Sequence, residues 1–294
     1  MKKNLRRLIA LALVAAIAAW FLTAPKRADP DIIAGIAPDL ALGEQTFIAG
    51  GCSACHAVEG ADDRLVLSGG MGFDSPFGIF YAPNISPSEQ GIGGWSALDL
   101  INAMQHGTSP KGAHYYPAFP YTTYQNADPA EIVSLHAYLQ TLPQDATPSR
   151  AHDVGFPFNI RRSLGGWKLL FMRAGWTIDP GDLTDEETRG RYLAEALGHC
   201  SECHTPRNIL GGPQRSKWLS GAPNPSGKGE IPNITPGGLD WSEGEILEYL
   251  TSGFTPDFDT VGGHMTAVVE NLAQLPASDR AAIAAYLKRV PAQP

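Results

Sequence analysis

Apolar residues recur at helical spacing along most of this chain of 294 residues. Where they return every three or four positions, the pattern is that of a helix with one buried face. We expect such helices over residues 39–49, 95–107, 129–142, 185–197, 241–253 and 277–290. No stretch alternates between apolar and polar residues as a half-exposed strand does. The pattern predicts an all-α protein.

The predicted helices come in two similar sets. The segment Pro83-Asn84-Ile85-Ser86-Pro87 returns as Pro232-Asn233-Ile234-Thr235-Pro236. In each set a tryptophan then opens a helical pattern that ends at a glycine twelve residues later, at Gly107 and at Gly253. Each set closes with an amphipathic helix. A repeat of this length indicates two helical domains of the same plan.

The repeat sets the expected domain boundaries. We place the first domain at residues 36–145 and the second at residues 181–294. Residues 146–180 are too apolar for a free linker, and we expect them to pack as a strap across both domains. A docking patch for a partner protein is the alternative interpretation of the strap.

The N-terminal stretch is apolar from residue 8 to residue 23 and follows four basic residues. Sixteen helical residues at about 1.5 Å each fall short of a hydrocarbon core of roughly 30 Å, so length admits both a signal peptide and a membrane anchor. A cut after Ala24 would leave Pro25 directly beyond it, which disfavours cleavage. We expect residues 1–27 to form an uncleaved anchor with the rest of the chain exported.

Charge narrows the range of partners. Lys and Arg number 22 against 30 Asp and Glu, and residues 1–27 hold six of these bases and no acid. The remainder therefore carries a formal charge of −14. Nucleic acid is disfavoured as a partner because phosphate binding needs a basic face. An acidic surface suits a basic redox partner, and it also serves solubility alone.

The candidate chemistry lies in a pentapeptide that occurs twice and uses all four cysteines. The copies are Cys52-Ser53-Ala54-Cys55-His56 and Cys200-Ser201-Glu202-Cys203-His204. This is the attachment pattern of a c-type haem, whose vinyl groups form thioethers while the histidine binds the iron. Zinc or disulfides leave both histidines unexplained, and the pairs lie 145 residues apart, far beyond usual zinc spacing. The motifs predict two covalently bound haems c, with His56 and His204 as iron ligands.

The sixth iron ligand is expected to differ between the domains. Met265 lies twelve residues after Gly253 and is the only methionine after Met172, so we assign it to the second haem; neighbouring His264 is the alternative. A thioether ligand raises the reduction potential.

In the first domain, Phe119 occupies the corresponding position, and phenylalanine cannot bind iron. His114 in the same loop is our first choice. The alternatives are an iron without a side-chain ligand and, elsewhere in the domain, Met71, Met104 and His106.

These residues resemble a known family. The set comprises both pentapeptides, Asn84-Ile85-Ser86-Pro87, Gly93-Gly94-Trp95, residues 114–121, and Cys203-His204-Thr205-Pro206-Arg207-Asn208. It is similar to the di-haem class I cytochromes c of proteobacteria, including cytochrome subunits of membrane-bound alcohol and gluconate dehydrogenases. The resemblance covers nearly all of the chain after the anchor. The dehydrogenase subunits usually carry a third haem motif, and a methionine where Phe119 stands.

The resemblance implies an electron carrier, without substrate chemistry of its own, on the periplasmic side of the bacterial inner membrane. It would connect a periplasmic dehydrogenase or another donor with the respiratory chain, an oxidase or a small cytochrome. The rival function is a haem enzyme, either a di-haem peroxidase or a thiosulfate-oxidising cytochrome, that uses an open site at the first haem. A structural subunit of an oxidase or dehydrogenase complex is a third possibility.

Overall fold

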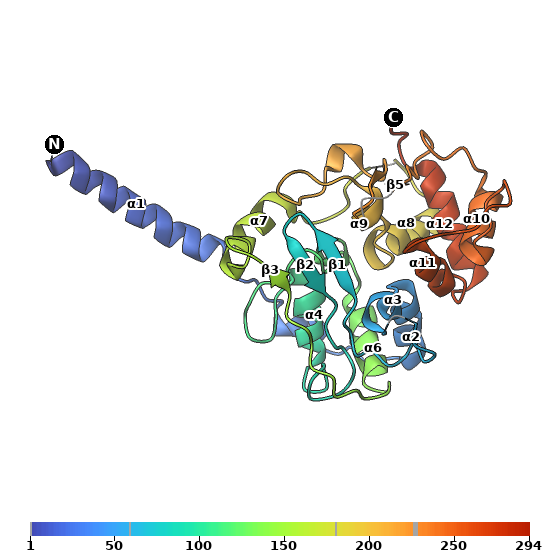
Figure 1. The fold of residues 1–294 in the computed structure, drawn as a ribbon, viewed down its shortest axis with the longest axis horizontal. Helices are drawn as coiled ribbons and strands as arrows, with labels where there is room; N and C mark the ends of the chain where they lie inside the picture. The colour runs from blue at the N-terminus through green and yellow to red at the C-terminus, as the bar shows by residue number, and fades with distance from the viewer. Residues whose placement is uncertain (1, 59, 180, 226–228) are drawn as a thin grey trace.

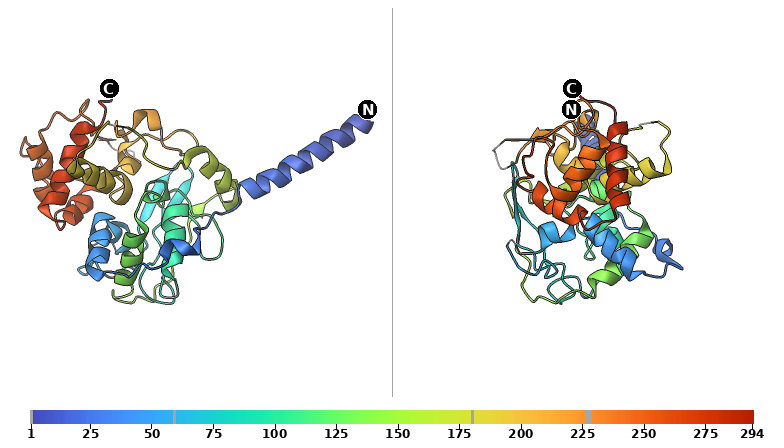
Figure 2. Two further views of the ribbon diagram at one scale, coloured as in Figure 1. Left: turned by 180° about the vertical axis from the view of Figure 1, so that it is seen from behind. Right: turned by 90° about the vertical axis from the view of Figure 1, so that its right-hand side faces the viewer.

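We describe the fold from a computed structural model that covers residues 2–58, 60–179, 181–225 and 229–294. Helix α1 (Lys2–Leu22) stands apart from the rest and has no buried residue. The other elements form one body beyond its C-terminal end (Figure 1, Figure 2). Among the described residues, α1 alone is long and apolar enough to cross a membrane, a property that signal sequences share.

The folded body is mostly helical, and its two halves run through the same order of elements. The first half contains η1 (Pro30–Ile33), α2 (Leu40–Ala49), α3 (Cys52–His56), α4 (Ala97–His106), α5 (Tyr121–Tyr124) and α6 (Pro129–Leu139). The second contains α8 (Asp185–Tyr192), the π-helical turn η3 (Leu193–Leu197), α9 (Cys200–His204), η4 (Arg215–Lys217), α10 (Glu243–Ser252), α11 (Met265–Leu272) and α12 (Ala277–Arg289).

A close helix pair recurs in each half. Helix α2 packs on α6, and α8 packs on α12. Each contact requires a glycine: a Cβ atom on Gly43 would lie 2.2 Å from the Ser134 carbonyl oxygen, and one on Gly190 would lie 1.8 Å from that of Ala282. No larger residue fits such distances without moving a backbone. The matched glycines therefore fix the first and last helices of each half against one another.

The middle helix of each half has the same ends. Capping boxes open α4 at Ser96 and α10 at Ser242, where an acidic residue three positions later completes the pair of hydrogen bonds. Both helices end at a glycine in the left-handed conformation, Gly107 with φ 57° and Gly253 with φ 80°. The loops beyond these glycines carry the residues at issue for the sixth iron ligand.

The expectation of an all-α protein is wrong in one respect, because short strands are present. Antiparallel β1 (Gly72–Ser75) and β2 (Gly78–Tyr81) form a hairpin that pairs Phe73 with Phe80, and β3 (Asp153–Val154) joins the β2 edge. In the second half, β4 (Ala222–Pro223) pairs with β5 (Glu230–Ile231). Segments of two to four residues are too short to show an alternating pattern.

The strap, residues 146–179 of the described chain, contains η2 (Arg161–Ser163) and α7 (Leu164–Phe171). It touches both halves. Lys168 Nζ donates to the Gly107 carbonyl oxygen at 2.8 Å in the first half, and Trp167 Nε1 donates to that of Leu210 at 2.9 Å in the second. Gly165 packs on Thr23, beyond the end of α1. The strap thus joins both halves to the N-terminal helix.

The core does not divide at the strap. Buried apolar side chains of both halves, from Phe47 in α2 to Tyr286 in α12, form one continuous cluster. A second, small cluster around Phe80, Tyr116 and Leu164 lies under the strap. The halves thus share one apolar core.

Candidate haem sites and the interface between them

Each pentapeptide forms one helical turn. Cys52, Cys55 and His56 make up one face of α3, and the matching residues lie on α9, because positions i, i+3 and i+4 share a side of a helix. The residue before each turn is in the left-handed conformation, Gly51 with φ 59° and His199 with φ 42°. The backbone thus presents two thiols and an imidazole together, twice.

The two motif histidines are held in the same way. Nδ1 of His56 donates to the Pro83 carbonyl oxygen and Nδ1 of His204 to that of Pro232, both at 2.8 Å. A donating Nδ1 leaves Nε2 unprotonated as the available metal ligand. Burial lowers the pKa of both imidazoles, which favours the neutral form that binds metal. Both rings are therefore in the state that a haem iron requires.

The loops after the motifs return to the histidines in both halves. The Gly69 N–H donates to the His56 carbonyl oxygen at 2.7 Å, and the Gly221 N–H donates to that of His204 at 2.8 Å. At each glycine a Cβ atom would clash with the backbone of the Pro83 or Pro232 segment, at 2.5 and 2.7 Å. The repeated Pro-Asn segment therefore lies against its histidine, held in a turn by the side chain of Asn84 or Asn233.

Burial favours the protonated form of the four cysteine thiols. All are free thiols in the structure. Burial raises the pKa of Cys52 and of Cys200 to about 12 and that of Cys55 to about 11, so the thiols are neutral near pH 7. Within the described residues, no group of three or more His, Cys, Asp or Glu is placed to hold a metal ion. The donor set fits two c-type haems and gives no support to a zinc site.

The loops for the sixth ligand share one backbone pattern. Tyr115 N–H donates to the Gly107 carbonyl oxygen, and Val261 N–H donates to that of Gly253, both at 2.7 Å. Isolated bridges pair Thr108 with His114 and Phe254 with Thr260. This register makes Phe119 the counterpart of Met265, which begins α11 and packs half-buried on the core.

His114 therefore corresponds to Thr260 and not to Met265. Its ring is buried, with 3% exposed, and its Nε2 lies 3.0 Å from the Thr23 carbonyl oxygen. A carbonyl can only accept, so Nε2 carries the proton and Nδ1 remains without a hydrogen-bond partner among the described residues. His114 as a ligand of the first haem stays a prediction, and Nδ1 is the atom left for it.

The remaining candidates for a sixth iron ligand lie outside the 107–119 loop. Met104 is buried in α4, while His106 ends that helix and has its pKa lowered by burial. Met71 precedes β1 and is half-buried, and His264 stands directly before α11. The structure brings none of them into the position that matches Met265.

Each motif helix makes a hydrogen bond across the contact between the halves. Ser53 Oγ of α3 donates to Asn271 Oδ1 of α11 at 3.2 Å, and Thr122 Oγ1 of α5 donates to Glu202 Oε1 of α9 at 2.6 Å. After burial, the Cys203 thiol is the next cause that raises the pKa of Cys55. Both motifs therefore lie at the contact between the halves.

Two side chains fill this contact that sequence reasoning did not single out. The rings of Tyr124 and His199 meet edge to face, with centroids 5.6 Å apart. The Tyr124 hydroxyl donates to the Gly50 carbonyl oxygen at 3.3 Å, one turn before the first motif. The position of His199 directly before Cys200 was visible in the sequence, but only the fold brings α5 beside it.

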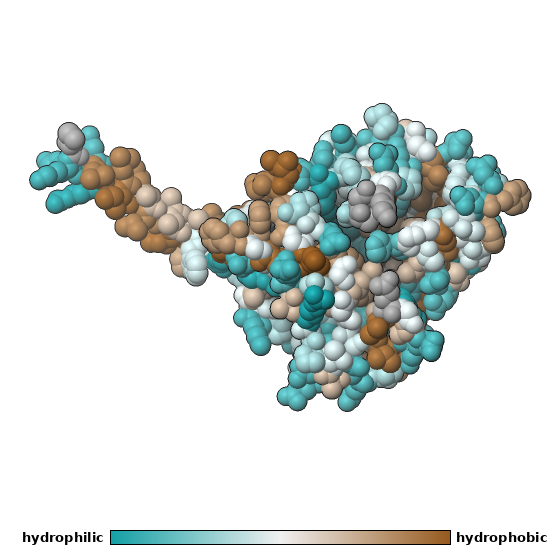
Figure 3. All heavy atoms as spheres, in the orientation of Figure 1, coloured by the Kyte–Doolittle hydropathy of each residue, from teal (hydrophilic) through white to brown (hydrophobic). Residues whose placement is uncertain are grey.

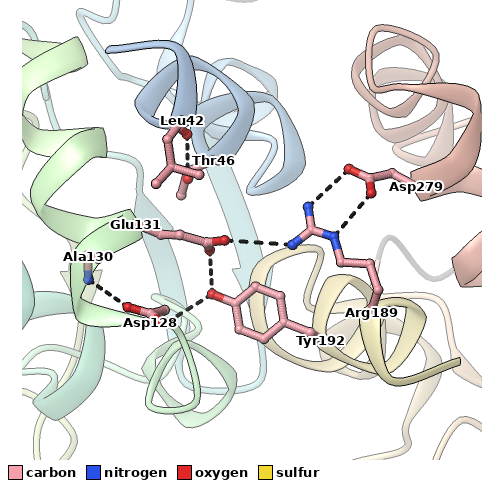
Figure 4. A network of polar contacts seen from close by, with 8 residues as sticks. All are labelled: Leu42, Thr46, Asp128, Ala130, Glu131, Arg189, Tyr192 and Asp279. Atoms are coloured by element: carbon pink, nitrogen blue, oxygen red, sulfur yellow. Dashed lines mark hydrogen bonds and ion pairs between the residues drawn. The ribbon is translucent and has the colours of Figure 1, made fainter. Parts of the chain in front are cut away.

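A polar network closes the edge of the same contact (Figure 4). Arg189 of α8 donates two hydrogen bonds to Asp279 of α12, at 3.1 and 3.0 Å, and pairs with Glu131 of α6 at 3.7 Å. Tyr192 donates to Glu131 and accepts from the Asp128 backbone N–H at 2.9 Å. One arginine thus links both halves.

Comparison with known proteins identifies the class to which this fold and these motifs belong. A family model described as cytochrome c matches residues 40–143. The chain is 55% identical over 295 residues to a diheme cytochrome c-type protein of Cereibacter sphaeroides, covering 99% of both chains. The chain therefore belongs to the di-haem cytochromes c, and this family supports two covalently attached c-type haems.

Other relatives are larger proteins. The chain is 39% identical over 265 residues to the fructose dehydrogenase cytochrome subunit of Gluconobacter japonicus, covering 87% of this chain and 53% of that one. It is 33% identical over 264 residues to the gluconate 2-dehydrogenase cytochrome c subunit of Pantoea cypripedii, covering 85% and 59%. The chain thus spans little more than half the length of these two subunits.

Proposed function

We propose that this chain is an electron carrier on the periplasmic side of the bacterial inner membrane. It accepts electrons from a dehydrogenase or another donor and passes them toward the respiratory chain. The observation that carries the proposal is that both motif helices lie at one shared interface, where Ser53 of α3 hydrogen-bonds to Asn271 and Glu202 of α9 to Thr122. Biological electron transfer needs short distances between centres, and a carrier with two attachment sites at one interface supplies one inside a single molecule.

We also propose that residues 36–145 and 181–294 are two tandem class I cytochrome c domains. The matched glycines of α2 and α8, the capping boxes of α4 and α10, and the identical loop register support this division. Because they share one apolar core, the two proposed domains are packed together and are not independent units joined by a linker. Residues 146–180 serve as the strap between them.

In this proposal each bound haem supplies a one-electron couple, and the chain sets its environment. Cys52, Cys55, Cys200 and Cys203 form the thioethers. His56 and His204 bind iron through Nε2, because Pro83 and Pro232 accept the proton at Nδ1 and fix each ring. Met265 is the sixth ligand of the second centre, which makes this the higher-potential one.

The tether of the proposed carrier is α1. Its 21 residues span about 32 Å at about 1.5 Å each, close to a hydrocarbon core of roughly 30 Å. The segment after it is built into the fold: Arg27 donates to the Pro110 carbonyl oxygen at 2.7 Å, and Ala28 N–H donates to Asn102 Oδ1 at 2.7 Å. His114 binds Thr23 within the same segment. Cleavage after Ala24 would remove the partner of a buried imidazole, which supports retention of the tether.

The partner we propose is a periplasmic dehydrogenase. Relatives that are 39% and 33% identical to this chain bear the names of fructose and gluconate dehydrogenase subunits. The whole chain has a formal charge of −8, and the part after the basic N-terminal segment has a formal charge of −14. This negative charge suits transient contact with a basic surface on a donor or acceptor.

One observation favours a second candidate function. Phe119 stands where Met265 stands in the other half, and His114 is bound to Thr23. An iron at the first motif without a side-chain sixth ligand could bind a small molecule, as a di-haem peroxidase or a thiosulfate-oxidising cytochrome requires. The same substitution is compatible with electron transfer alone, so the two functions need a direct test.

The test is a potentiometric titration of the purified full-length protein, followed by absorption spectra. The carrier proposal expects two reversible one-electron transitions and no turnover with peroxide or thiosulfate. Carbon monoxide is then added to the reduced protein. Carbon monoxide binding at the first centre, together with turnover of peroxide or thiosulfate, would support the enzyme. Two reversible transitions without turnover of either substrate would support the carrier.

A further inference from the structure

The strap exposes large apolar side chains that the fold leaves uncovered. Among the described residues of the strap they are Phe156 (81% exposed), Phe158 (45%), Ile160 (47%), Leu169 (53%), Leu170 (57%) and Trp176 (37%). A patch of this kind on a soluble surface marks an interaction site. The strap also differs from the rest of the chain in charge. Its residues 146–179 include five basic and two acidic residues, within a protein of net charge −8.

Helix α7 shows how the patch is oriented. Leu164 and Gly165 are buried, and Lys168 points inward to the carbonyl oxygens of His106 and Gly107 at 2.6 and 2.8 Å. Leu169 and Leu170 lie on the opposite face, toward solvent. Lys168 thus binds the strap to the body, while the apolar face of α7 is exposed to solvent.

The patch lies where α1 meets the body. Gly165 packs on Thr23, and the Arg162 guanidinium donates to the Trp20 carbonyl oxygen and lies 4.3 Å from the centroid of the Trp20 ring. Both ribbon views place α7 beside the C-terminal end of α1 (Figure 1, Figure 2). Apolar surface continues from α1 onto the adjoining side of the body (Figure 3). A bilayer crossed by α1 would therefore begin next to α7.

We infer that the strap lies in the interfacial layer of the bilayer that α1 spans, as a second and peripheral membrane contact. The inference rests on the proposed membrane anchor. Aromatic and aliphatic side chains flanked by Arg are typical of segments that lie at a membrane surface, and anionic lipids attract such bases. The contact fixes the orientation of the folded body, because a surface held at two places cannot turn freely on its tether.

The test measures depth in the membrane at one site of the patch. The full-length haem-loaded protein is reconstituted into vesicles of phosphatidylethanolamine and phosphatidylglycerol. Leu170→Cys is labelled with a nitroxide, since the four natural cysteines are held in thioethers. Power-saturation electron paramagnetic resonance compares collisions with oxygen, which partitions into lipid, and with a nickel chelate, which remains in water, each against the same oxidised sample without either reagent.

The matched control is Leu40→Cys at the start of α2. Leu40 is a helical leucine with 53% of its surface exposed, against 57% for Leu170, and α2 lies on the side of the body away from α1. We expect collisions of the Leu170 label with the nickel chelate to fall at least threefold below those of the Leu40 label. In vesicles of phosphatidylcholine alone the difference should shrink, because the bases lose their lipid partner.

The possible results distinguish the membrane contact of the strap from the α1 anchor on which that inference rests. Protein that does not sediment with the vesicles shows that α1 is no anchor, and both claims fall. Protein that sediments with a Leu170 label as accessible to the nickel chelate as the Leu40 label keeps the anchor and overturns the membrane contact. The patch would then be a surface for a protein partner. Unchanged haem spectra in both labelled variants establish that each is folded.

Discussion

The loops 107–119 and 253–265 share a backbone and differ in chemistry. Both begin at a left-handed glycine and both carry the same bridge and hydrogen bonds. Yet one ends at Phe119 and the other at Met265. The backbone is therefore set by glycine and by the hairpin-like register, independently of the side chain at the last position of each loop. A repeat can thus keep its fold while one copy changes the property that sets a reduction potential.

The largest expected effect is the loss of one covalent haem when either attachment site is removed. Cys52→Ser with Cys55→Ser should abolish covalent haem in the first half, and Cys200→Ser with Cys203→Ser in the second, because no thioether can form. Pyridine haemochrome analysis should give one haem per chain instead of two. Ser53→Ala is the control and should retain both. Two covalent haems in either double variant would contradict the assignment of the motifs.

An exchange of the two loop residues tests the comparison directly. Met265→Phe should lower the potential of the second centre by on the order of 100 mV or more, since axial ligands set haem potentials over a wide range. Phe119→Met should raise the potential of the first centre and suppress carbon monoxide binding there. Spectroelectrochemical titration measures both changes.

The control for this exchange is Phe254→Met, at an exposed position of the second loop. It should alter neither potential. An unchanged second potential in Met265→Phe would remove Met265 as a ligand, and His264 would be the next residue to test.

The matched glycines test whether the halves fold together. Gly43→Ala and Gly190→Ala should each lower the free energy of unfolding by about 3 kcal/mol, because a Cβ atom must displace a facing backbone. Since one core connects the halves, both substitutions should shift a single denaturant transition. Gly244→Ala in α10, where the nearest atom lies 3.9 Å away, should not destabilise. Two separate transitions would mean that the halves fold independently.

His114 decides between the two descriptions of the first centre. From the Thr23 contact we expect His114→Ala to lower stability by about 2 kcal/mol, because a buried side chain and its hydrogen bond are lost, and to leave the haem spectrum unchanged. His136→Ala, which removes a 2.9 Å hydrogen bond to the Trp95 carbonyl oxygen, is the matched control. A change of the first haem from low spin to high spin in His114→Ala alone would instead identify His114 as the ligand, as the sequence predicts.

Sequence reasoning reached the parts of this protein that depend on local spacing. The pentapeptides and the Trp-to-Gly helices follow from distances along the chain, and the helices are present close to the expected bounds. The assignment of Met265 as a ligand, which rests on the same kind of count, stays a prediction. The strands were missed because two to four residues carry no periodicity. The side chains at the contact of the halves, such as Tyr124 and His199, were missed because they meet only through the packing of distant segments.

The smallest expected effect concerns an asymmetry at the edge of that contact. Arg189 stands directly before Gly190, whereas Leu42 stands directly before Gly43, so one half alone supplies the arginine that links both (Figure 4). Arg189→Gln should lower stability by about 1 kcal/mol, because the side chain is partly exposed and water screens its pairs. The haem potentials should not change.

A double-mutant cycle of Arg189→Gln with Glu131→Gln isolates the bond between the halves. We expect a coupling free energy of about 0.5 kcal/mol from urea unfolding. The control cycle pairs Arg289→Gln with Glu187→Gln, an ion pair at 3.5 Å within the second half. Coupling at Arg189 that vanishes would mean that the shared core, the strap and the other hydrogen bonds across the contact hold the halves in register. In that case the single arginine serves its own half through Asp279.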